Sequence, residues 1–275
     1  MEQNTINQLK IFANEMRKDI IEGTYNAGSG HPGGSLSCAD ILAYLYFYEM
    51  NVDSSNPKAE NRDRFVLSKG HAAPALYAAL AGKGYFPRED IKTLRHITSH
   101  LQGHPDMNKT PGVDMSTGSL GIGISNACGM ALGAKVAKGD YRVFCITGDG
   151  ELQEGQVWEA AMFASHYKLD NLIVFVDANR LQIDGNVCEV MAVEPIDKRF
   201  ESFGWYAQRI DGHDFEQIAA AVENAKKVEG KPSVIVCDTV KGKGVSFMEN
   251  KAGWHGVAPK KDDYETAIKE LSENN

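Results

Sequence analysis

The sequence has no hydrophobic run long enough to cross a bilayer, and its polar, acidic N-terminus does not resemble a secretory signal peptide. It also lacks an excess of positive charge, since the formal net charge is −8. That balance argues against a general nucleic-acid or anionic-membrane surface. The five cysteines include no C-x-x-C pair and lie mostly in apolar runs, as reduced core thiols do. We therefore predict a soluble, cytoplasmic protein that binds neither nucleic acid nor membrane.

The 275 residues have the composition of an ordinary globular domain, with 43% hydrophobic and 24% charged residues. No repeat, low-complexity segment or linker divides the chain. Apolar runs typical of buried strands occur at residues 64–68, 143–146, 172–176, 205–210 and 233–240. Helical patterns lie between them. We predict one α/β domain over residues 1–275, with a mostly parallel central sheet of about five or more strands and helices on both faces.

The first fifty residues contain three local patterns. Apolar residues at helical spacing predict a first amphipathic helix over residues 4–22. Residues 27–34 are too rich in glycine for regular structure and predict a loop. Ser37 and Asp40 have the spacing of a capping box that opens a second helix. This second helix is apolar nearly all round over residues 41–47, which predicts that it is buried, with a partner chain as the candidate cover.

Residues 141–185 contain two apolar strands joined by one predicted crossover helix. The first strand ends at Asp149, between two glycines, and the second ends near Asn179. In an open parallel sheet both residues emerge at the same carboxyl edge, where ligands bind. Their carboxylate and amide oxygens suit Mg²⁺ or Ca²⁺. A tight turn capped by Asp149 is the alternative for Gly-Asp-Gly alone, but Asn179 at the next strand end favours a metal–diphosphate site.

Histidines are frequent in the glycine- and proline-bearing loops, at positions His31, His71, His104, His213 and His255. A single histidine of this kind is more often structural than functional, although such loops carry function disproportionately. His96, His100 and His104 are spaced by four, as on a zinc-binding helix face. Gly103 and Pro105 disrupt a helix there, and no cysteine or acidic ligand follows at motif spacing, so zinc is disfavoured.

Two further segments are typical of a site for an anionic ligand. Residues 117–121 precede a small-residue helix predicted over 121–138, and free N–H groups at its positive end would favour diphosphate oxygens. A plain helix start is the alternative. Lys241 and Lys243 form an ordinary basic turn by themselves, but beside a bound diphosphate a lysine supplies the needed countercharge.

These segments together resemble the transketolase family, specifically its thiamine diphosphate-binding N-terminal half. Gly-Asp-Gly, 28 intervening residues and Asn179 are similar to the thiamine diphosphate fingerprint. The resemblance covers nearly the whole chain. Its specific segments are GSGHPGGSLS at 28–37, SKGHAAPALYA at 68–78, GHPDMNKTPGVDMSTGSLGIG at 103–123, GDGELQEGQVWEA at 148–160 and DANRLQIDG at 177–185.

The resemblance implies roles for particular residues. The implied metal ligands for Mg²⁺ or Ca²⁺ are the Asp149 carboxylate, the Asn179 side-chain oxygen and the Leu181 backbone oxygen. The implied catalytic residues are His31, His71, His104 and His255 at the entry to the thiazolium ring, with Glu154 and Glu159 at a subunit interface that links paired sites. Contacts to thiamine diphosphate are implied for Gly34, His71, Gly118, Ser119, Leu120, Asp149, Gly150, Glu154, Asn179, Lys241 and His255.

The same resemblance implies a transketolase subunit, which moves a two-carbon ketol unit from a ketose phosphate to an aldose in carbohydrate metabolism such as the pentose phosphate pathway. The family's pyrimidine-binding domain has no counterpart in these 275 residues. Met1 and the charged tail ending in Asn274 and Asn275 have the character of natural termini. We therefore expect a separate chain to serve as the C-terminal transketolase subunit, in a heterotetramer with two copies of each.

Several alternatives stay open. The deoxyxylulose-phosphate synthase group is related, but the histidine set and residues 103–113 favour transketolase. A modified sugar, such as a sulfo-sugar or a branched sugar phosphate, is an alternative substrate. A non-catalytic cofactor-binding subunit is a third interpretation, disfavoured by the retention of Asp149, Asn179 and the loop histidines. A nicotinamide-binding Rossmann domain is poorer still, because no G-x-G-x-x-G follows an early strand.

Overall fold

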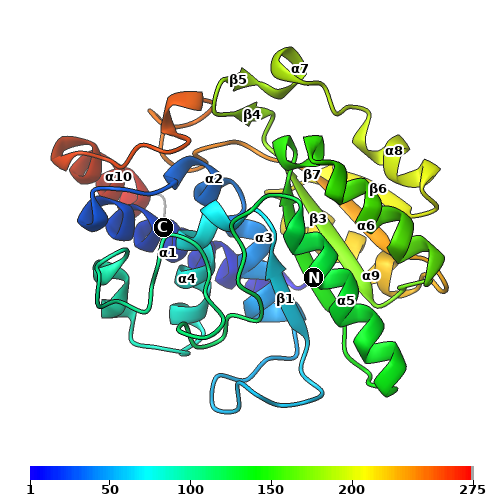
Figure 1. The fold of residues 1–275 in the computed structure, drawn as a ribbon. Helices are drawn as coiled ribbons and strands as arrows, with labels where there is room; N and C mark the ends of the chain where they lie inside the picture. Colours follow the sequence, from blue (N-terminus) through cyan, green and yellow to red (C-terminus); the bar gives the residue numbers. More distant parts are fainter. Residues whose placement is uncertain (274–275) are drawn as a thin grey trace.

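The computed structural model describes residues 1–273, so the predicted natural end at Asn274 and Asn275 lies outside the described residues. A five-stranded parallel sheet runs through the centre of the fold in the order β1-β2-β3-β7-β6 (Figure 1). These strands are β1 (Arg64–Leu67), β2 (Val143–Gly148), β3 (Leu172–Ala178), β7 (Ser233–Asp238) and β6 (Tyr206–Asp211). The predicted α/β fold is confirmed.

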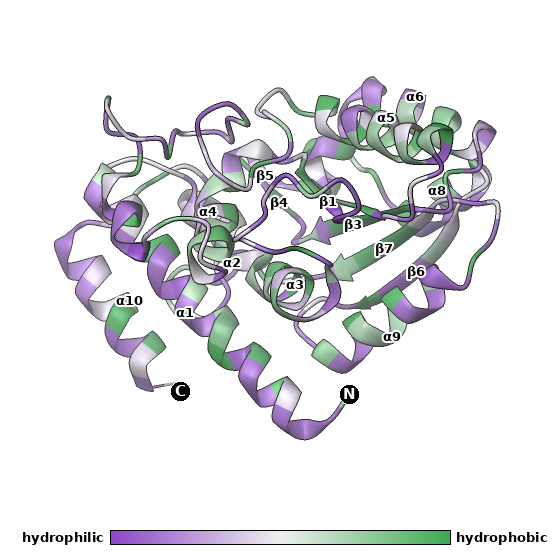
Figure 2. Cartoon of the chain, turned by 90° about the horizontal axis from the view of Figure 1, so that it is seen from below, coloured by the Kyte–Doolittle hydropathy of each residue, from purple (hydrophilic) through white to green (hydrophobic). Residues whose placement is uncertain are grey.

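The strands are buried on both faces of the sheet, so successive residues point into two different hydrophobic clusters. In β2, Phe144 and Ile146 pack into one cluster while Val143 and Cys145 pack into the other. Such strands form continuous apolar runs rather than alternating ones, which is why the runs are visible in the sequence. Figure 2 shows β3 and β7 as mostly hydrophobic along their length, whereas the outer helix α10 (Lys261–Glu273) is mostly hydrophilic.

Helices cover each face of the sheet. One cluster joins the sheet to α5 (Ile122–Ala137), α6 (Gly155–His166) and α8 (Ile196–Ser202). The other joins it to α1 (Gln3–Ala27), α3 (Ala39–Tyr44), α4 (Ala73–Gly82), α9 (Phe215–Lys226) and α10. The smaller elements are α2 (Pro32–Ser37), α7 (Val187–Val190), a π-helical segment (Leu45–Glu49), four 3₁₀ segments (Gly70–Ala72, Arg88–Thr93, Gly150–Gln153, Ala252–Trp254) and the hairpin β4 (Leu181–Gln182) and β5 (Gly185–Asn186).

The structure corrects the predicted start of the chain. Helix α1 runs on to Ala27 and ends at Gly28, whose φ of 58° is the left-handed conformation that terminates many helices. The glycine-rich segment after it is partly helical, because Pro32 opens α2. The predicted capping box is wrong: the Ser37 hydroxyl bonds to the Gly34 carbonyl and the Asp177 carboxylate, and Asp40 binds Arg17 and His213.

The apolar helix predicted at residues 41–47 is buried within this chain. Ile41, Leu42, Tyr44 and Leu45 are 0% exposed and belong to the cluster that contains α1, α4 and α9. A helix enclosed by its own fold presents no apolar face to another chain. The prediction that this segment lies under a partner subunit is therefore wrong, and a partner must dock elsewhere.

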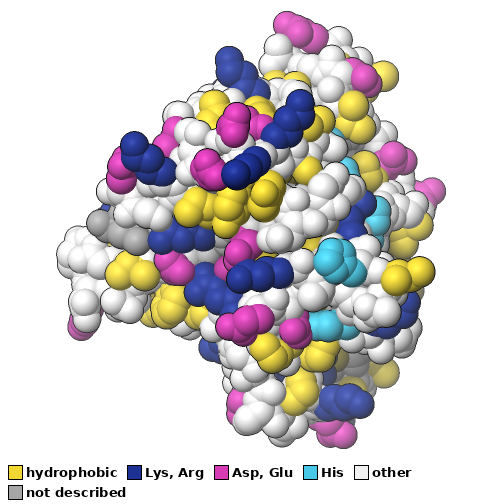
Figure 3. All heavy atoms as spheres, turned by 90° about the vertical axis from the view of Figure 1, so that its left-hand side faces the viewer, with side chains coloured by type: hydrophobic (Ala, Val, Ile, Leu, Met, Phe, Trp, Pro, Cys, Tyr) yellow, Lys and Arg dark blue, Asp and Glu magenta, His cyan; other side chains and the backbone are white. Residues whose placement is uncertain are grey.

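No helix within residues 1–273 combines the length and hydrophobicity that a membrane crossing requires. Of the cysteines, Cys38, Cys128, Cys145 and Cys237 are buried and Cys188 is exposed, and all five are free. The face seen in Figure 3 carries positive and negative side chains interspersed with one another, and histidine side chains reach its surface.

Candidate cofactor-binding site

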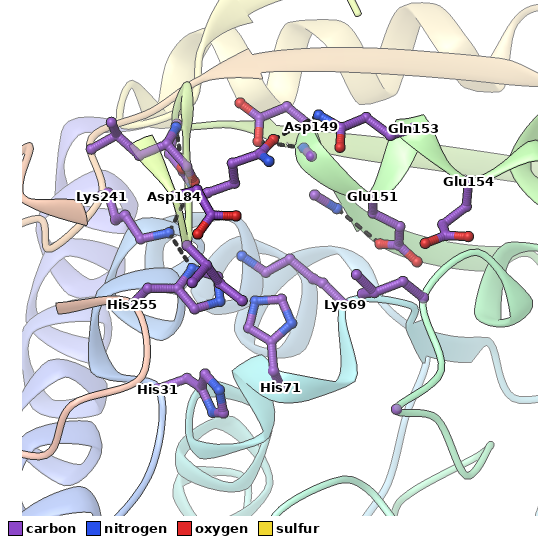
Figure 4. Close-up of a pocket in the computed structure, with 18 residues that line it drawn as sticks. His31, Lys69, His71, Asp149, Glu151, Gln153, Glu154, Asp184, Lys241 and His255 are labelled. Carbon is purple, nitrogen blue, oxygen red and sulfur yellow. Dashed lines mark hydrogen bonds between the residues drawn. The ribbon is translucent and has the colours of Figure 1, made fainter. Parts of the chain in front are cut away.

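A cavity of about 330 Å³ lies at the carboxyl edge of the sheet, where β1, β2 and β3 end. Its walls also include the β4–β5 hairpin and the loops that carry the histidines (Figure 4). The predicted residues that line it are His31, His71, Gly118, Leu120, Asp149, Gly150, Glu154, Asn179, Leu181, Lys241 and His255. Residues spread over more than 220 positions of the sequence thus meet at one edge, as expected for a parallel sheet.

Asp149 and Asn179 lie together at the ends of β2 and β3. The Asp149 carboxylate accepts the backbone N–H groups of Gly150 (2.8 Å) and Arg180 (2.6 Å). The Asn179 amide nitrogen donates to Asp177 (3.2 Å), while its oxygen accepts the Leu181 N–H (3.1 Å). Burial and the nearby Asp177 carboxylate raise the pKa of Asp149 to about 6. A bound cation would favour the ionised form of this carboxylate.

The oxygen atoms at this edge fit a hard cation. One carboxylate, one side-chain amide oxygen and one backbone carbonyl are the donor set that Mg²⁺ and Ca²⁺ accept, with further positions left for phosphate oxygens and water. Within residues 1–273, no three His, Cys, Asp or Glu side chains converge to hold a metal.

Lys241 places a positive charge beside these oxygens. Its ammonium group donates to the Leu181 carbonyl (3.0 Å) and to Nδ1 of His255 (2.9 Å). Burial, together with the charge of Lys69, lowers the pKa of Lys241 to about 8. An anion beside Lys241 would offset the desolvation of the ammonium group, which makes this end of the cavity suited to a diphosphate.

Three imidazole rings line the cavity next to Lys241, and His255 is in contact with that lysine. The ring centroids of His31 and His71 are 5.3 Å apart, those of His31 and His255 are 5.6 Å apart, and those of His71 and His255 are 5.1 Å apart. Burial and nearby cations lower the pKa of each ring, to about 4 for His31 and about 3 for His255. The three rings are consequently neutral near pH 7, and each offers one donor and one acceptor.

Four predicted residues lie outside the cavity wall. The Gly34 carbonyl accepts the Lys69 ammonium group (2.7 Å) behind His71. His104 packs against Gly118, where a Cβ atom would come within 3.1 Å of the ring. Ser119 is exposed on the loop before α5, and Glu159 is exposed on α6. The histidines considered for zinc do not converge, and His100 instead pairs with Asp90 (3.0 Å).

Some of the N–H groups at the start of α5 already have acceptors within the fold, whereas those of Gly118, Ser119 and Leu120 donate to no acceptor within residues 1–273. The Glu151 carboxylate accepts the N–H groups of Gly121 (2.8 Å) and Gly148 (3.0 Å), and the Ser68 hydroxyl accepts that of Ile124 (3.1 Å). The Glu151 carboxylate therefore places a negative charge at the positive end of α5. Gly118 and Leu120 line the cavity, and their N–H groups stay available to a ligand there.

Lys69 and Asp177 were not recognisable as site residues from the motifs; they form a buried ion pair, and Lys69 lines the cavity. Asp177 also accepts hydrogen bonds from Ser37 and Thr239. Its bond to the Asn179 amide nitrogen leaves the amide oxygen to accept the Leu181 N–H. The sequence did contain a signal for a buried ion pair. A lysine and an aspartate each follow apolar strand residues, where burial is expected and a buried charge needs a partner.

The chain matches a known family along nearly its whole length. Residues 3–274 match the family described as transketolase, thiamine diphosphate binding domain. The chain belongs to this family. Its membership confirms the predicted resemblance and supports thiamine diphosphate as the ligand of the cavity.

Relatives in this family include separate subunits as well as longer chains. A 6-deoxy-6-sulfo-D-fructose transketolase subunit from a Clostridium species is 49% identical over 259 residues, which cover 94% of each chain. An apulose-4-phosphate transketolase subunit from Phocaeicola vulgatus is 43% identical, over 98% of this chain and 95% of that protein. Human transketolase is 44% identical, over 98% of this chain but 43% of its own length.

Solved transketolases share the fold. Transketolase from Leishmania mexicana has a TM-score of 0.91 at 32% identity, with 96% of this chain and 41% of that chain covered. Transketolase from Campylobacter jejuni has a TM-score of 0.89 at 35% identity, with 99% and 43% covered. This chain thus has the length of the separate transketolase subunits, whereas it spans less than half of the single-chain transketolases. It is a transketolase-type enzyme subunit.

Proposed function

We propose that this chain is the thiamine diphosphate-binding subunit of a two-chain transketolase, which transfers a two-carbon ketol unit from a ketose phosphate to an aldose. One observation supports this proposal most strongly. A single cavity combines a cation-binding oxygen set, Lys241 and three neutral histidines, of which His255 accepts a hydrogen bond from Lys241. That arrangement suits a ligand with a metal-bound diphosphate and a reacting group that faces a polyhydroxylated substrate.

The metal and the diphosphate would be held at the Lys241 end. Asp149, Asn179 and the Leu181 carbonyl would hold Mg²⁺ or Ca²⁺, and Lys241 would bind the anionic oxygens. When bound, thiamine diphosphate supplies a thiazolium ring that accepts the electron pair released as a carbon–carbon bond beside a carbonyl breaks. The protein's own contribution is to hold the anion and to exclude water from the buried part of the cavity.

The histidines would bind the sugar and exchange protons with it. Nδ1 of His255 accepts from Lys241, so the ring proton resides on Nε2 and is available to a substrate oxygen. Nδ1 of His31 is buried and has no hydrogen-bond partner within residues 1–273, which leaves it free for a ligand. Neutral imidazoles can donate to a developing alkoxide and take a proton from a hydroxyl near neutral pH. His104 is exposed and packs against Gly118 at the cavity wall, so we include it among the residues that would bind the sugar.

A second chain is part of the proposal. The relatives of matching length are named as transketolase subunits, which implies a partner. On this chain, α5, α6 and the residue that ends α6 carry exposed apolar side chains. We name these five residues, Ile122, Val136, Met162, Phe163 and Tyr167, the α5–α6 face. Glu154, which lines the cavity, and Glu159, which is exposed on α6, belong to the same segment. We propose that the C-terminal transketolase subunit, or a second copy of this chain, covers this face in a heterotetramer of two copies of each.

The substrate can differ from a common ketose phosphate. Two relatives of matching length are named for 6-deoxy-6-sulfo-D-fructose and for apulose-4-phosphate. These names favour a modified sugar as the second candidate for this chain. The three histidines would bind the hydroxyl and carbonyl groups that all of these ketoses share. Residues that distinguish the other end of the sugar must therefore lie outside this histidine wall, including in the partner subunit.

The test is a ketol-transfer assay on the purified chain saturated with thiamine diphosphate and Mg²⁺, checked by mass spectrometry for copurified partner. We expect no turnover from the chain alone and turnover after addition of a C-terminal transketolase subunit. Parallel reactions with a ketose phosphate, a 6-sulfo-ketose and a branched ketose phosphate would identify the donor. Robust turnover without a partner would contradict the two-chain proposal, and cofactor binding without turnover on any sugar would favour a non-catalytic subunit.

A further inference from the structure

His213 is a loop histidine that lies outside the cavity wall. It follows β6, before α9, and its side chain is 14% exposed. Both ring nitrogens are used: Nδ1 is 2.6 Å from the Asp40 carboxylate, and Nε2 accepts the backbone N–H of Val240 at 2.9 Å. A nitrogen that accepts a hydrogen bond carries no proton, so the proton is on Nδ1 and is donated to Asp40. The ring therefore has one defined tautomer and orientation.

Asp40 also holds a second side chain that reaches the same backbone turn. Arg17 donates to the Asp40 carboxylate at 2.5 Å and, through Nε, to the Lys243 carbonyl at 3.1 Å. Although burial acts to raise the pKa of Asp40, Arg17 and His213 lower it to about 2, so the carboxylate is ionised. One buried carboxylate thus orients two side chains, which bind the N–H at the start and the C=O at the end of the turn from Val240 to Lys243.

The turn between these two anchors carries Lys241 into the cavity. Lys243 N–H closes it on the Val240 carbonyl (3.1 Å), and the Gly242 N–H donates to the Gly33 carbonyl (3.0 Å). From this backbone position the Lys241 ammonium group reaches both the Leu181 carbonyl and His255. A lysine side chain has four rotatable bonds, so the placement of its charge depends on a fixed backbone.

We propose that Asp40, Arg17 and His213 form a positioning device that fixes the 240–243 turn, so that Lys241 meets the anionic group of the cofactor. The inference rests on the proposed function, because it takes thiamine diphosphate as the ligand of Lys241. His213 is a positioning residue in this device and acts on the ligand through Val240 and Lys241. A rigid supporting contact of this kind lowers the cost of ordering the lysine on binding.

Two matched substitutions separate the contacts of His213. His213→Gln places an amide oxygen near the position of Nε2 and retains an acceptor for Val240. His213→Asn retains a donor to Asp40 but is too short to accept from Val240. In calorimetric titrations of the full chain with thiamine diphosphate and Mg²⁺, we expect His213→Asn to weaken binding roughly five- to tenfold and His213→Gln to stay within about twofold of wild type. Melting temperatures establish that both variants are folded.

Two further measurements test the route through Lys241. Hydrogen exchange at the Val240 amide, measured by NMR without cofactor, should be faster in His213→Asn than in His213→Gln. In a Lys241→Met background, His213→Asn should have almost no further effect on the dissociation constant, because both changes then act on one contact. Equal affinities for the Asn and Gln variants, or additive effects with Lys241→Met, would overturn the proposal. If His213→Asn does not fold, the same comparison with Arg17→Lys, which loses one of its two contacts, decides the question.

The proposed function and this inference fail in different ways. If the wild-type chain binds no thiamine diphosphate, the proposed function is refuted. The role of Asp40, Arg17 and His213 in cofactor binding is then refuted with it. Wild-type binding together with unchanged binding by His213→Asn would refute the positioning role alone.

Discussion

The Lys69 ammonium group and the Asp177 carboxylate form a buried ion pair at the wall of the cavity. Their residues are 1% and 0% exposed, and they follow or end strands that flank β2 on its two sides. Asp177 in turn orients the Asn179 amide. The pair therefore links the β1 end of the sheet to the residue expected to hold the metal, although neither member is exposed to solvent.

Breaking this pair should destabilise the chain strongly. Lys69→Met leaves the Asp177 carboxylate buried without its cation, and such changes cost about 3–5 kcal/mol of unfolding free energy. The double variant Lys69→Met with Asp177→Asn should recover a substantial part of that loss. Urea denaturation measures both, with Lys231→Met, at an exposed lysine near the start of β7, as a control that changes stability by less than about 0.5 kcal/mol. A stable single variant would show that the pair is not coupled.

Asp149→Ala should abolish metal-dependent cofactor binding. The substitution removes the only carboxylate among the expected ligands and leaves neutral oxygens to hold the cation against water. Calorimetry of thiamine diphosphate with Mg²⁺ is the measurement. Asp140→Ala is the matched control, because Asp140 is exposed near the opposite end of the same strand. Near wild-type affinity in Asp149→Ala would exclude this residue as a ligand.

Replacing His31 or His104 by Ala should slow turnover more than it weakens cofactor binding. Loss of one preorganised donor to a developing oxyanion costs roughly 3–4 kcal/mol, or about two to three decades in rate. The comparison needs steady-state rates of the enzyme assembled with its partner, and cofactor affinities of the same samples. Unchanged rates would assign the two histidines a structural role only.

The His31 ring should stay neutral across the neutral pH range. Burial, with Arg95, His104 and Lys241, lowers its pKa to about 4, whereas the unfolded value is about 6.5. The contribution of the His31 ring to the free energy of unfolding is therefore fully present above pH 6.5. It is lost as the pH falls toward 4, because the unfolded chain binds the proton before the folded chain does. NMR titration of the ring should give a midpoint near 4, and His31→Gln should show a shallower loss of stability over this interval. A midpoint near 6.5 would contradict the burial of the ring.

A charge on the α5–α6 face should prevent assembly with the partner. Phe163→Glu places a carboxylate in the apolar surface and should weaken association by at least about 30-fold, the loss typical of a central interface residue. Ile97→Glu is the control, since Ile97 is 99% exposed on a distant loop and belongs to no such surface. Sedimentation of the mixed subunits distinguishes the two. Wild-type assembly by Phe163→Glu would remove this face from the interface.

The central part of the sheet and the main motif residues could be predicted from the sequence. Strands buried on both faces are apolar at consecutive positions, so residues 143–146 and 172–176 were recognisable without any partner strand. The positions of Asp149 and Asn179 then followed from the parallel connection between those strands. Local signals were weaker at the N-terminus, where tertiary contacts recruited Ser37 and Asp40 away from the predicted capping box.

The sequence by itself determined which segments form the central sheet, which loops carry the histidines, and which strand ends meet. Only the tertiary structure decided what holds them there. Ser68 and Glu151 are 83 residues apart, Lys69 and Asp177 are 108 apart, and Asp40 and His213 are 173 apart. The tertiary structure also decided that the apolar helix α3 is covered by its own chain, while α5 and α6 expose apolar side chains. Hydrophobic periodicity reports how a segment is buried, but pairing between distant polar groups depends on geometry that arises only when the layers pack.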